Sequence, residues 1–103
     1  MNTVHYIWIG GEVPTKYLNN FQKCVKLNPS FIFKIWKDNE CLALIEEYEL
    51  LGNFIPLSLI CKCNLLKYII LHKFGGIYTD FDILWKQPFI KIMNDYNFPN
   101  VDM

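Results

Sequence analysis

The sequence has no surplus of charge of either sign. Its 10 basic side chains balance 10 acidic ones, which leaves a formal net charge of zero. Binding to a nucleic-acid backbone or to an anionic membrane by charge alone needs a basic surplus, so partners held in that way are excluded. A phosphate-bearing ligand would therefore have to be held locally, by a metal ion or by a few well-placed donors.

Long apolar runs are also missing. The most apolar stretch, residues 54–74, is interrupted by Lys62, Asn64, Lys67 and His72. A transmembrane helix needs roughly 18–20 apolar residues in succession. Residues 1–11 have neither the basic start nor the long apolar core of a signal peptide. We therefore expect no transmembrane segment and a cytoplasmic protein.

Histidines are too few, and cysteines too poorly spaced, for a zinc site. The chain has 2 histidines, and none of its 4 cysteines forms a C-x-x-C pair. Cys61 and Cys63 fall in a predicted helix, where positions i and i+2 point apart. We expect buried free thiols, which favours a reducing compartment.

Glycine and proline are scarce, at 5 each in 103 residues, while 52% of the residues are hydrophobic. Disorder is therefore excluded, and residues 1–103 fit a single domain. The order strand, helix, strand, helix, helix, strand predicts an α/β fold with a mostly parallel sheet. Strands are expected at residues 4–9, 31–36 and 77–85, and helices at 14–27, 39–50, 56–74 and 89–95. Gly52 and Asn53 should form a loop. The pair Gly10-Gly11 should end the first strand, and the pair Gly75-Gly76 should end the long helix. The apolar stripe of that helix should consist of Leu59, Cys63, Leu66 and Ile70.

Asp80 and Asp82 lie in the third predicted strand, and ligands of parallel sheets bind beyond the carboxyl ends of the strands. In an extended chain, residues i and i+2 project to the same side, so the two carboxylates would meet while Phe81 turns into the core. A divalent cation relieves their repulsion, and hard oxygen ligands favour magnesium, manganese or calcium. A solvated acidic turn would give the same short motif, but it would not need the apolar neighbours Tyr78 and Phe81.

Two segments resemble the signatures of one enzyme family. Residues 64–82 read N-L-L-K-Y-I-I-L-H-K-F-G-G-I-Y-T-D-F-D, which is similar to the signature of the DXD-containing glycosyltransferases. Residues 4–11, V-H-Y-I-W-I-G-G, resemble the opening strand of that family. The family includes yeast Golgi initiating mannosyltransferases, capsular polysaccharide transferases and the catalytic domains of large clostridial glucosylating toxins.

The resemblance implies a GT-A-like fold and an enzyme that transfers a hexose from a nucleoside-diphosphate sugar to a glycan, lipid-linked or protein acceptor. It also implies Mn²⁺ or Mg²⁺ as cofactor and retention of the anomeric configuration. By motif position, Asp80 and Asp82 would be the catalytic carboxylates that bind the metal and the donor phosphates. Trp8 would stack on the nucleotide base, and Tyr78 would reach the donor through its hydroxyl. A place in the core would explain Trp8 and Tyr78 equally well.

The chain departs from the family pattern in two ways. Where the family usually has Ser-Asp-x-x-Arg, it has Cys63, Asn64 and Lys67. Asn64 and Lys67 would still face the donor sugar from one helix face, but without the aspartate charge and the arginine fork, so donor binding should be altered. Family domains also continue well beyond the D-x-D motif. We therefore expect a truncated domain that lacks a C-terminal half or a partner chain, and a catalytically inactive nucleotide-sugar-binding or partner-binding fragment is the alternative to an enzyme.

Overall fold

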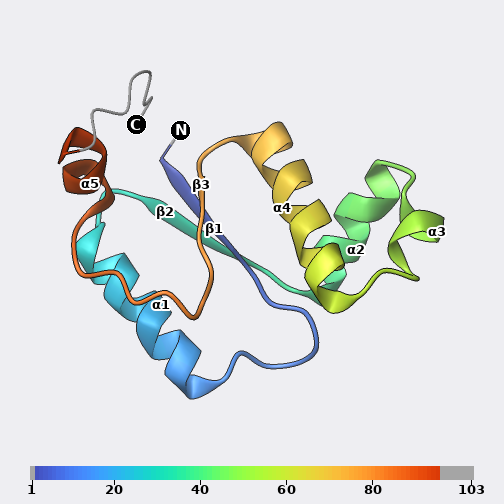
Figure 1. The fold of residues 1–103 in the computed structure, drawn as a ribbon, viewed down its shortest axis with the longest axis horizontal. Helices are drawn as coiled ribbons and strands as arrows, with labels where there is room; N and C mark the ends of the chain where they lie inside the picture. Colours follow the sequence, from blue (N-terminus) through green and yellow to red (C-terminus); the bar gives the residue numbers. More distant parts are fainter. Residues whose placement is uncertain (1, 96–103) are drawn as a thin grey trace.

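The computed structural model describes residues 2–95, which form an α/β fold (Figure 1). Within this range the strands are β1 (Thr3–Ile7), β2 (Ile32–Trp36) and β3 (Ile77–Tyr78). The helices are α1 (Thr15–Leu27), α2 (Asp38–Glu47), α3 (Leu51–Phe54), α4 (Leu59–Phe74) and α5 (Phe89–Asp95). The element order agrees with the sequence prediction except for the additional helix α3, and the short final helix has the predicted bounds.

The sheet of the described residues is parallel throughout, in the order β2-β1-β3. Thr3 pairs with Ile32 on one side of β1, and Val4 pairs with Ile77 on the other. Helix α1 connects β1 to β2 on one side of the sheet, whereas α2 and α4 lie on the opposite side (Figure 1). The predicted α/β fold with a mostly parallel sheet is therefore confirmed.

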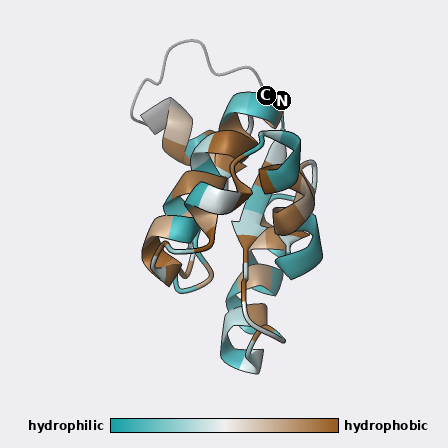
Figure 2. Cartoon of the chain, turned by 90° about the vertical axis from the view of Figure 1, so that its right-hand side faces the viewer, coloured by the Kyte–Doolittle hydropathy of each residue, from teal (hydrophilic) through white to brown (hydrophobic). Residues whose placement is uncertain are grey.

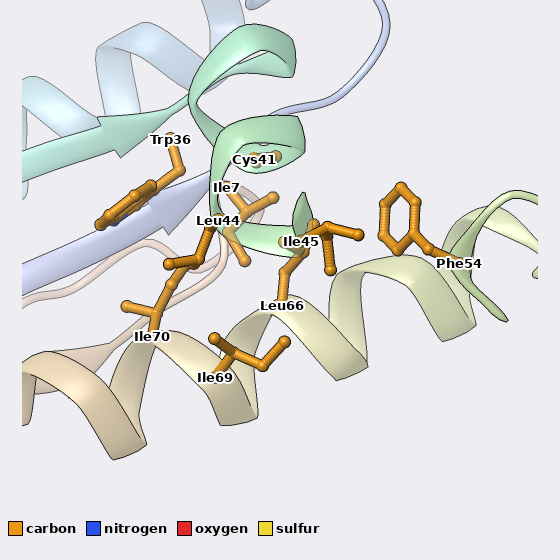
Figure 3. Packing of buried hydrophobic residues seen from close by; sticks show 9 residues of the cluster. All are labelled: Ile7, Trp36, Cys41, Leu44, Ile45, Phe54, Leu66, Ile69 and Ile70. Atoms are coloured by element: carbon orange, nitrogen blue, oxygen red, sulfur yellow. The ribbon is translucent and has the colours of Figure 1, made fainter. Parts of the chain in front are cut away.

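Strand β1 is the centre of the fold because its side chains alternate between two buried clusters. The α1-side core contains Val4 and Tyr6, and the α4-side core contains Ile7. Figure 2 shows hydrophobic and hydrophilic segments side by side within the helices, as expected where each helix buries one face. The α1-side core consists of Val4, Tyr6, Val13, Cys24, Phe31, Phe81 and Phe89. The α4-side core (Figure 3) consists of Ile7, Trp36, Cys41, Leu44, Ile45, Phe54, Leu66, Ile69 and Ile70.

Helix α4 begins three residues later than predicted. Pro56 was expected in its first turn, but the cap is Ser58, whose hydroxyl oxygen accepts a hydrogen bond from the Cys61 amide at 3.3 Å. The predicted loop at Gly52 and Asn53 is wrong, because both residues lie in α3. The predicted apolar stripe is correct for Leu66 and Ile70 only: Cys63 is half-buried, and Leu59 is 58% exposed.

The end of α4 agrees with the prediction. Gly75 and Gly76 have φ values of 67° and 91°, a conformation that side chains with a Cβ disfavour. A Cβ on Gly76 would lie 2.3 Å from the carbonyl oxygen of Thr3. The absence of a Cβ at Gly76 therefore allows the backbone that leads into β3 to lie close to the backbone of Thr3 on β1.

None of the four cysteines is paired, so the prediction of free thiols is confirmed. Their predicted burial is correct for Cys24 and Cys41, but Cys61 is exposed and Cys63 half-buried. Burial raises the pKa of the Cys41 thiol to about 12. In the part of the chain that the structure describes, no helix has the length and hydrophobicity needed to cross a bilayer.

Candidate functional site

The D-x-D segment is a turn and not the extended strand that the sequence suggested. Strand β3 ends at Tyr78, and the amide of Ile83 donates a hydrogen bond to the carbonyl oxygen of Asp80 at 3.2 Å. The predicted strand over residues 77–85 is therefore wrong beyond its first two residues. Such a turn is stabilised by its own hydrogen bond and needs no partner strand. Asp80 and Asp82 are exposed on either side of Phe81, which is 4% exposed.

Phe81 fixes this turn to the α1-side core, as the sequence predicted. Its ring lies 4.7 Å from that of Tyr6 and 6.2 Å from that of Phe21, between ring centroids. The side-chain amide of Asn20 on α1 donates to the carbonyl oxygen of Phe81 at 3.0 Å. The two aspartates thus stand on a turn whose middle residue is anchored in the core.

Tyr78 is half-buried beside the first aspartate. Its hydroxyl donates to Asp80 Oδ1 at 2.9 Å. Burial, together with the neighbouring Asp80 carboxylate, raises the pKa of the Tyr78 hydroxyl. The phenol therefore keeps its proton and acts as a donor that orients the Asp80 carboxylate.

Trp8 follows the last residue of β1 and continues its pairing with β2, because its amide donates to the carbonyl oxygen of Trp36 at 2.9 Å. Its ring lies 5.6 Å from that of Tyr17 and 5.8 Å from that of Phe81, between centroids. The side chain is half-buried, and its buried Nε1–H has no hydrogen-bond acceptor among the described residues. Trp8 thus packs against the core and still has an unused donor.

These side chains border a pocket of about 690 Å³ beyond the carboxyl ends of β1 and β3. Five of the six predicted site residues line this pocket. They are Trp8, Asn64, Tyr78, Asp80 and Asp82. Small-molecule pockets usually have volumes of about 300–1,000 Å³, so the space suits a ligand of that size. The structure brings the five residues together, and their individual roles stay predictions.

The sixth predicted residue, Lys67, is not among the pocket-lining residues. Its Nζ lies 5.8 Å from the centroid of the Tyr78 ring and 5.3 Å from that of Tyr68. Lys67 is therefore next to a pocket residue, on the same helix as Asn64 and one turn further along. Cation–π contact with these rings favours its present position.

Comparison with known proteins identifies the group to which the chain is related. Residues 14–99 match the family described as the glycosyltransferase sugar-binding region containing the DXD motif. The match covers most of the 103 residues. The chain belongs to this family.

Similar members of the DXD glycosyltransferase family come from fungi and a virus. Inositol phosphoceramide mannosyltransferase 3 of Schizosaccharomyces pombe is 27% identical over 84 residues, which cover 78% of this chain and 23% of that protein. Mannosyl phosphorylinositol ceramide synthase CSH1 of Saccharomyces cerevisiae is 29% identical over 82 residues, covering 77% and 22%. An uncharacterized glycosyltransferase of Acanthamoeba polyphaga mimivirus is 28% identical over 100 residues, covering 84% and 37%. The chain thus spans between 22% and 37% of the length of these three relatives. No solved structure matches it significantly.

The donor set of the DXD turn fits a hard divalent cation that keeps several ligand positions open. No group of three or more His, Cys, Asp or Glu side chains suited to a metal is found among residues 2–95. Residues 2–95 therefore do not by themselves form a closed, all-protein metal cage. Mg²⁺ is usually held in proteins by one or two carboxylates, with water and substrate phosphates completing its shell. Asp80 and Asp82 supply such a pair at the pocket.

Seven pocket-lining residues were not predicted as site residues: Ile7, Ile9, Tyr17, Leu59, Ile60, Cys63 and Phe81. Tyr17 on α1 contacts Trp8, while Leu59 and Ile60 begin α4 at the opposite side of the pocket. Tyr17 precedes Phe21 by four residues, so helical spacing could have placed both on one face. Leu59 was assigned to the core because its spacing fits the apolar stripe, and periodicity alone does not distinguish a pocket wall from a core.

Proposed function

We propose that this chain forms the donor-binding part of a metal-dependent glycosyltransferase with a GT-A-like fold. It would transfer a hexose from a nucleoside-diphosphate sugar to an acceptor hydroxyl, with retention of the anomeric configuration. The observation that carries the proposal is the gathering of Trp8, Asp80 and Asp82 around one pocket of about 690 Å³ at the carboxyl ends of parallel strands. Ligands of open α/β sheets bind at such ends.

Each pocket residue receives a role from its chemistry and its place. Trp8 offers an aromatic face to the nucleotide base, and stacking of this kind contributes about 1–3 kcal/mol per base. Its unpaired Nε1–H gives it a donor for a ligand acceptor. Asn64, exposed on α4 at the pocket, can hydrogen-bond to sugar hydroxyls through both halves of its amide.

Asp80 and Asp82 would hold a Mn²⁺ or Mg²⁺ ion together with the donor diphosphate. The bound ion supplies Lewis-acid stabilisation of the diphosphate leaving group. The Tyr78 hydroxyl occupies Asp80 Oδ1, which leaves Oδ2 of the same carboxylate for other ligands. Phe81, buried between the two aspartates, keeps the turn that bears them against the sheet. No side chain of the pocket is assigned as a nucleophile or base.

The relatives suggest which sugar to test first. Four of them are named as mannosyltransferases or mannosyl phosphorylinositol ceramide synthases. Mannose is therefore the first donor sugar to try, although the altered pair Asn64 and Lys67 could change the preference. The acceptor, a glycan, a lipid-linked sugar or a protein, would bind with the help of regions outside this chain, in a C-terminal half or a partner chain.

The proposal is tested first by calorimetric titration of GDP and UDP with and without Mn²⁺. We expect binding that requires the metal and that is lost in Asp80→Asn and Asp82→Asn, since an amide is a weaker ligand for a hard cation than a carboxylate. Glu46, exposed on α2, is not a pocket-lining residue, so Glu46→Gln, which also replaces one carboxylate by an amide, is the control and should bind as the wild type does. Metal-independent binding would remove the assignment of the two carboxylates.

A binding module without turnover is the second candidate. Two observations favour it: Lys67 is not at the pocket wall, and the chain contains 10 lysines but no arginine, so it has no forked donor for the diphosphate. A hydrolysis assay across nucleotide sugars separates the two candidates. Metal-dependent binding with hydrolysis rates equal in the wild type and both aspartate variants would favour the binding module.

A further inference from the structure

We infer that Asn20 is a positioning residue of the D-x-D turn, and this inference rests on the function proposed above. Asn20 lies on α1, 61 residues from Phe81 in the sequence, and its side-chain amide donates to the Phe81 carbonyl oxygen at 3.0 Å. That carbonyl belongs to the peptide group between Phe81 and Asp82. Because peptide groups are planar, a hydrogen bond to this oxygen restricts the orientation of the whole peptide group, and with it the direction of the backbone at Asp82.

A second hydrogen bond fixes the preceding peptide group. The amide of Ile83 donates to the carbonyl oxygen of Asp80 at 3.2 Å. The turn therefore closes on itself through the Asp80 carbonyl and is tied to α1 through the Phe81 carbonyl. Of these two links, only the one from Asn20 connects the turn to another element, so it relates the carboxylates to the rest of the pocket.

The place of Asn20 on α1 supports the same conclusion. Tyr17, three residues before Asn20, shares its face of the helix, and Phe21 lies one turn after Tyr17. Tyr17 lines the pocket and contacts Trp8, while Phe21 packs against Phe81. One face of α1 thus contacts both the aromatic wall of the pocket and the turn that carries the aspartates.

Positioning matters here because two like charges stand on a short turn. Without a cation, Asp80 and Asp82 repel each other and favour a more open turn. A hydrogen bond that holds the peptide between them opposes this opening before the ligand arrives. Groups that orient metal ligands without touching the metal typically contribute 10- to 100-fold to metal affinity or activity. We expect an effect at about the lower end, tenfold, because Asn20 acts on the backbone of the turn.

The test compares Asn20→Ala with Asn19→Ala, a matched change at an exposed asparagine of the same helix. Mn²⁺ affinity is measured by the loss of the free-ion electron paramagnetic resonance signal, in the presence of saturating GDP and, separately, UDP. We expect Mn²⁺ affinity to fall about tenfold in Asn20→Ala and to stay unchanged in Asn19→Ala. A merely structural role would lower the melting temperature without changing the Mn²⁺ affinity of the folded protein, and that outcome would overturn the inference.

Amide hydrogen exchange without metal tests the same link independently. The Ile83 amide, which closes the turn, should exchange about tenfold faster in Asn20→Ala than in the wild type, while amides of α4 exchange equally in both. Equal exchange of Ile83 in the two proteins would overturn the role of Asn20 alone. Failure of the wild type to bind Mn²⁺ with either nucleotide would instead overturn the proposed function, so the two failures are distinguishable.

Discussion

The three tryptophans differ in how their indole N–H groups are used. Trp36 donates to His5 Nδ1 at 3.1 Å, and Trp85 donates to Thr79 Oγ1 at 2.8 Å. The N–H of Trp8, a pocket-lining residue, is buried and has no acceptor within residues 2–95. A buried donor without an acceptor costs about 1–3 kcal/mol, so a ligand oxygen or nitrogen placed there would recover that energy. This contrast distinguishes Trp8 as the tryptophan whose indole N–H is unpaired within residues 2–95.

We predict that Trp8→Phe and Trp85→Phe have opposite consequences. Trp8→Phe keeps an aromatic face but removes the N–H, so nucleoside-diphosphate affinity should fall about three- to tenfold while the free energy of unfolding changes by less than about 1 kcal/mol. Trp85→Phe leaves the buried Thr79 hydroxyl without its donor, so the free energy of unfolding should fall by about 1–2 kcal/mol with unchanged affinity. Titration calorimetry and urea unfolding measure the two quantities. Equal affinity losses in both variants would contradict the role of Trp8.

At the scale of elements, hydrophobic periodicity predicted helices better than it predicted the end of β3. Helix α1 begins and ends within one residue of its prediction, because its apolar residues recur at helical spacing. The D-x-D segment was read as extended because it continues the apolar pattern of β3. In the fold, however, β3 pairs with β1 only as far as Tyr78, and the chain then turns. Because β1 continues to Ile7, the ladder ends where β3 turns away and not for lack of partner residues, and a single sequence does not show where that turn begins.

Substitutions at two glycines compare a junction between elements with a helix interior. Gly76 lies between α4 and β3, whereas Gly52 lies within α3. We predict that Gly76→Ala lowers the free energy of unfolding by at least about 2 kcal/mol, because the new Cβ would lie 2.3 Å from the Thr3 carbonyl oxygen at a positive φ. Gly52→Ala in α3 meets no atom within 4 Å and should raise stability by up to about 1 kcal/mol. Urea unfolding of both variants checks the pair. A stable Gly76→Ala protein would show that β3 does not need this close approach to β1.

At the scale of the whole molecule, the pocket is assembled from segments far apart in the sequence. Trp8, Asn64 and the D-x-D turn could be predicted because each lies in a segment with its own recognisable pattern. Tyr17 and Ile60 could not, because their place at the pocket depends on how α1 and α4 pack on opposite sides of β1. The position of Lys67 could not be predicted fully either. Helical spacing predicts that it lies near Asn64, but its amine lies 5.8 Å from the centroid of the Tyr78 ring, and a single sequence does not show that contact.

His5 joins three elements of this assembly. It lies on β1, accepts a hydrogen bond from Trp36 of β2 at Nδ1, and donates from Nε2 to the carbonyl oxygen of Gly75 at the end of α4, 2.9 Å away. These bonds require the neutral ring with its proton on Nε2. Burial lowers the pKa of His5, and the charge of Lys34 lowers it further, against the opposing effect of the Gly75 carbonyl.

This arrangement predicts a loss of stability on mild acidification. The unfolded chain takes up a proton at His5 near pH 6.5, whereas the native protein takes it up only at a lower pH. The stabilisation is therefore complete above about pH 6.5 and decreases as the pH falls, by at most about 1.4 kcal/mol per pH unit. Urea unfolding between pH 7 and pH 5 should show this slope in the wild type and in His72→Gln, a change at the exposed histidine of α4. The slope should disappear in His5→Gln, and its persistence there would mean that another group takes up the proton on unfolding.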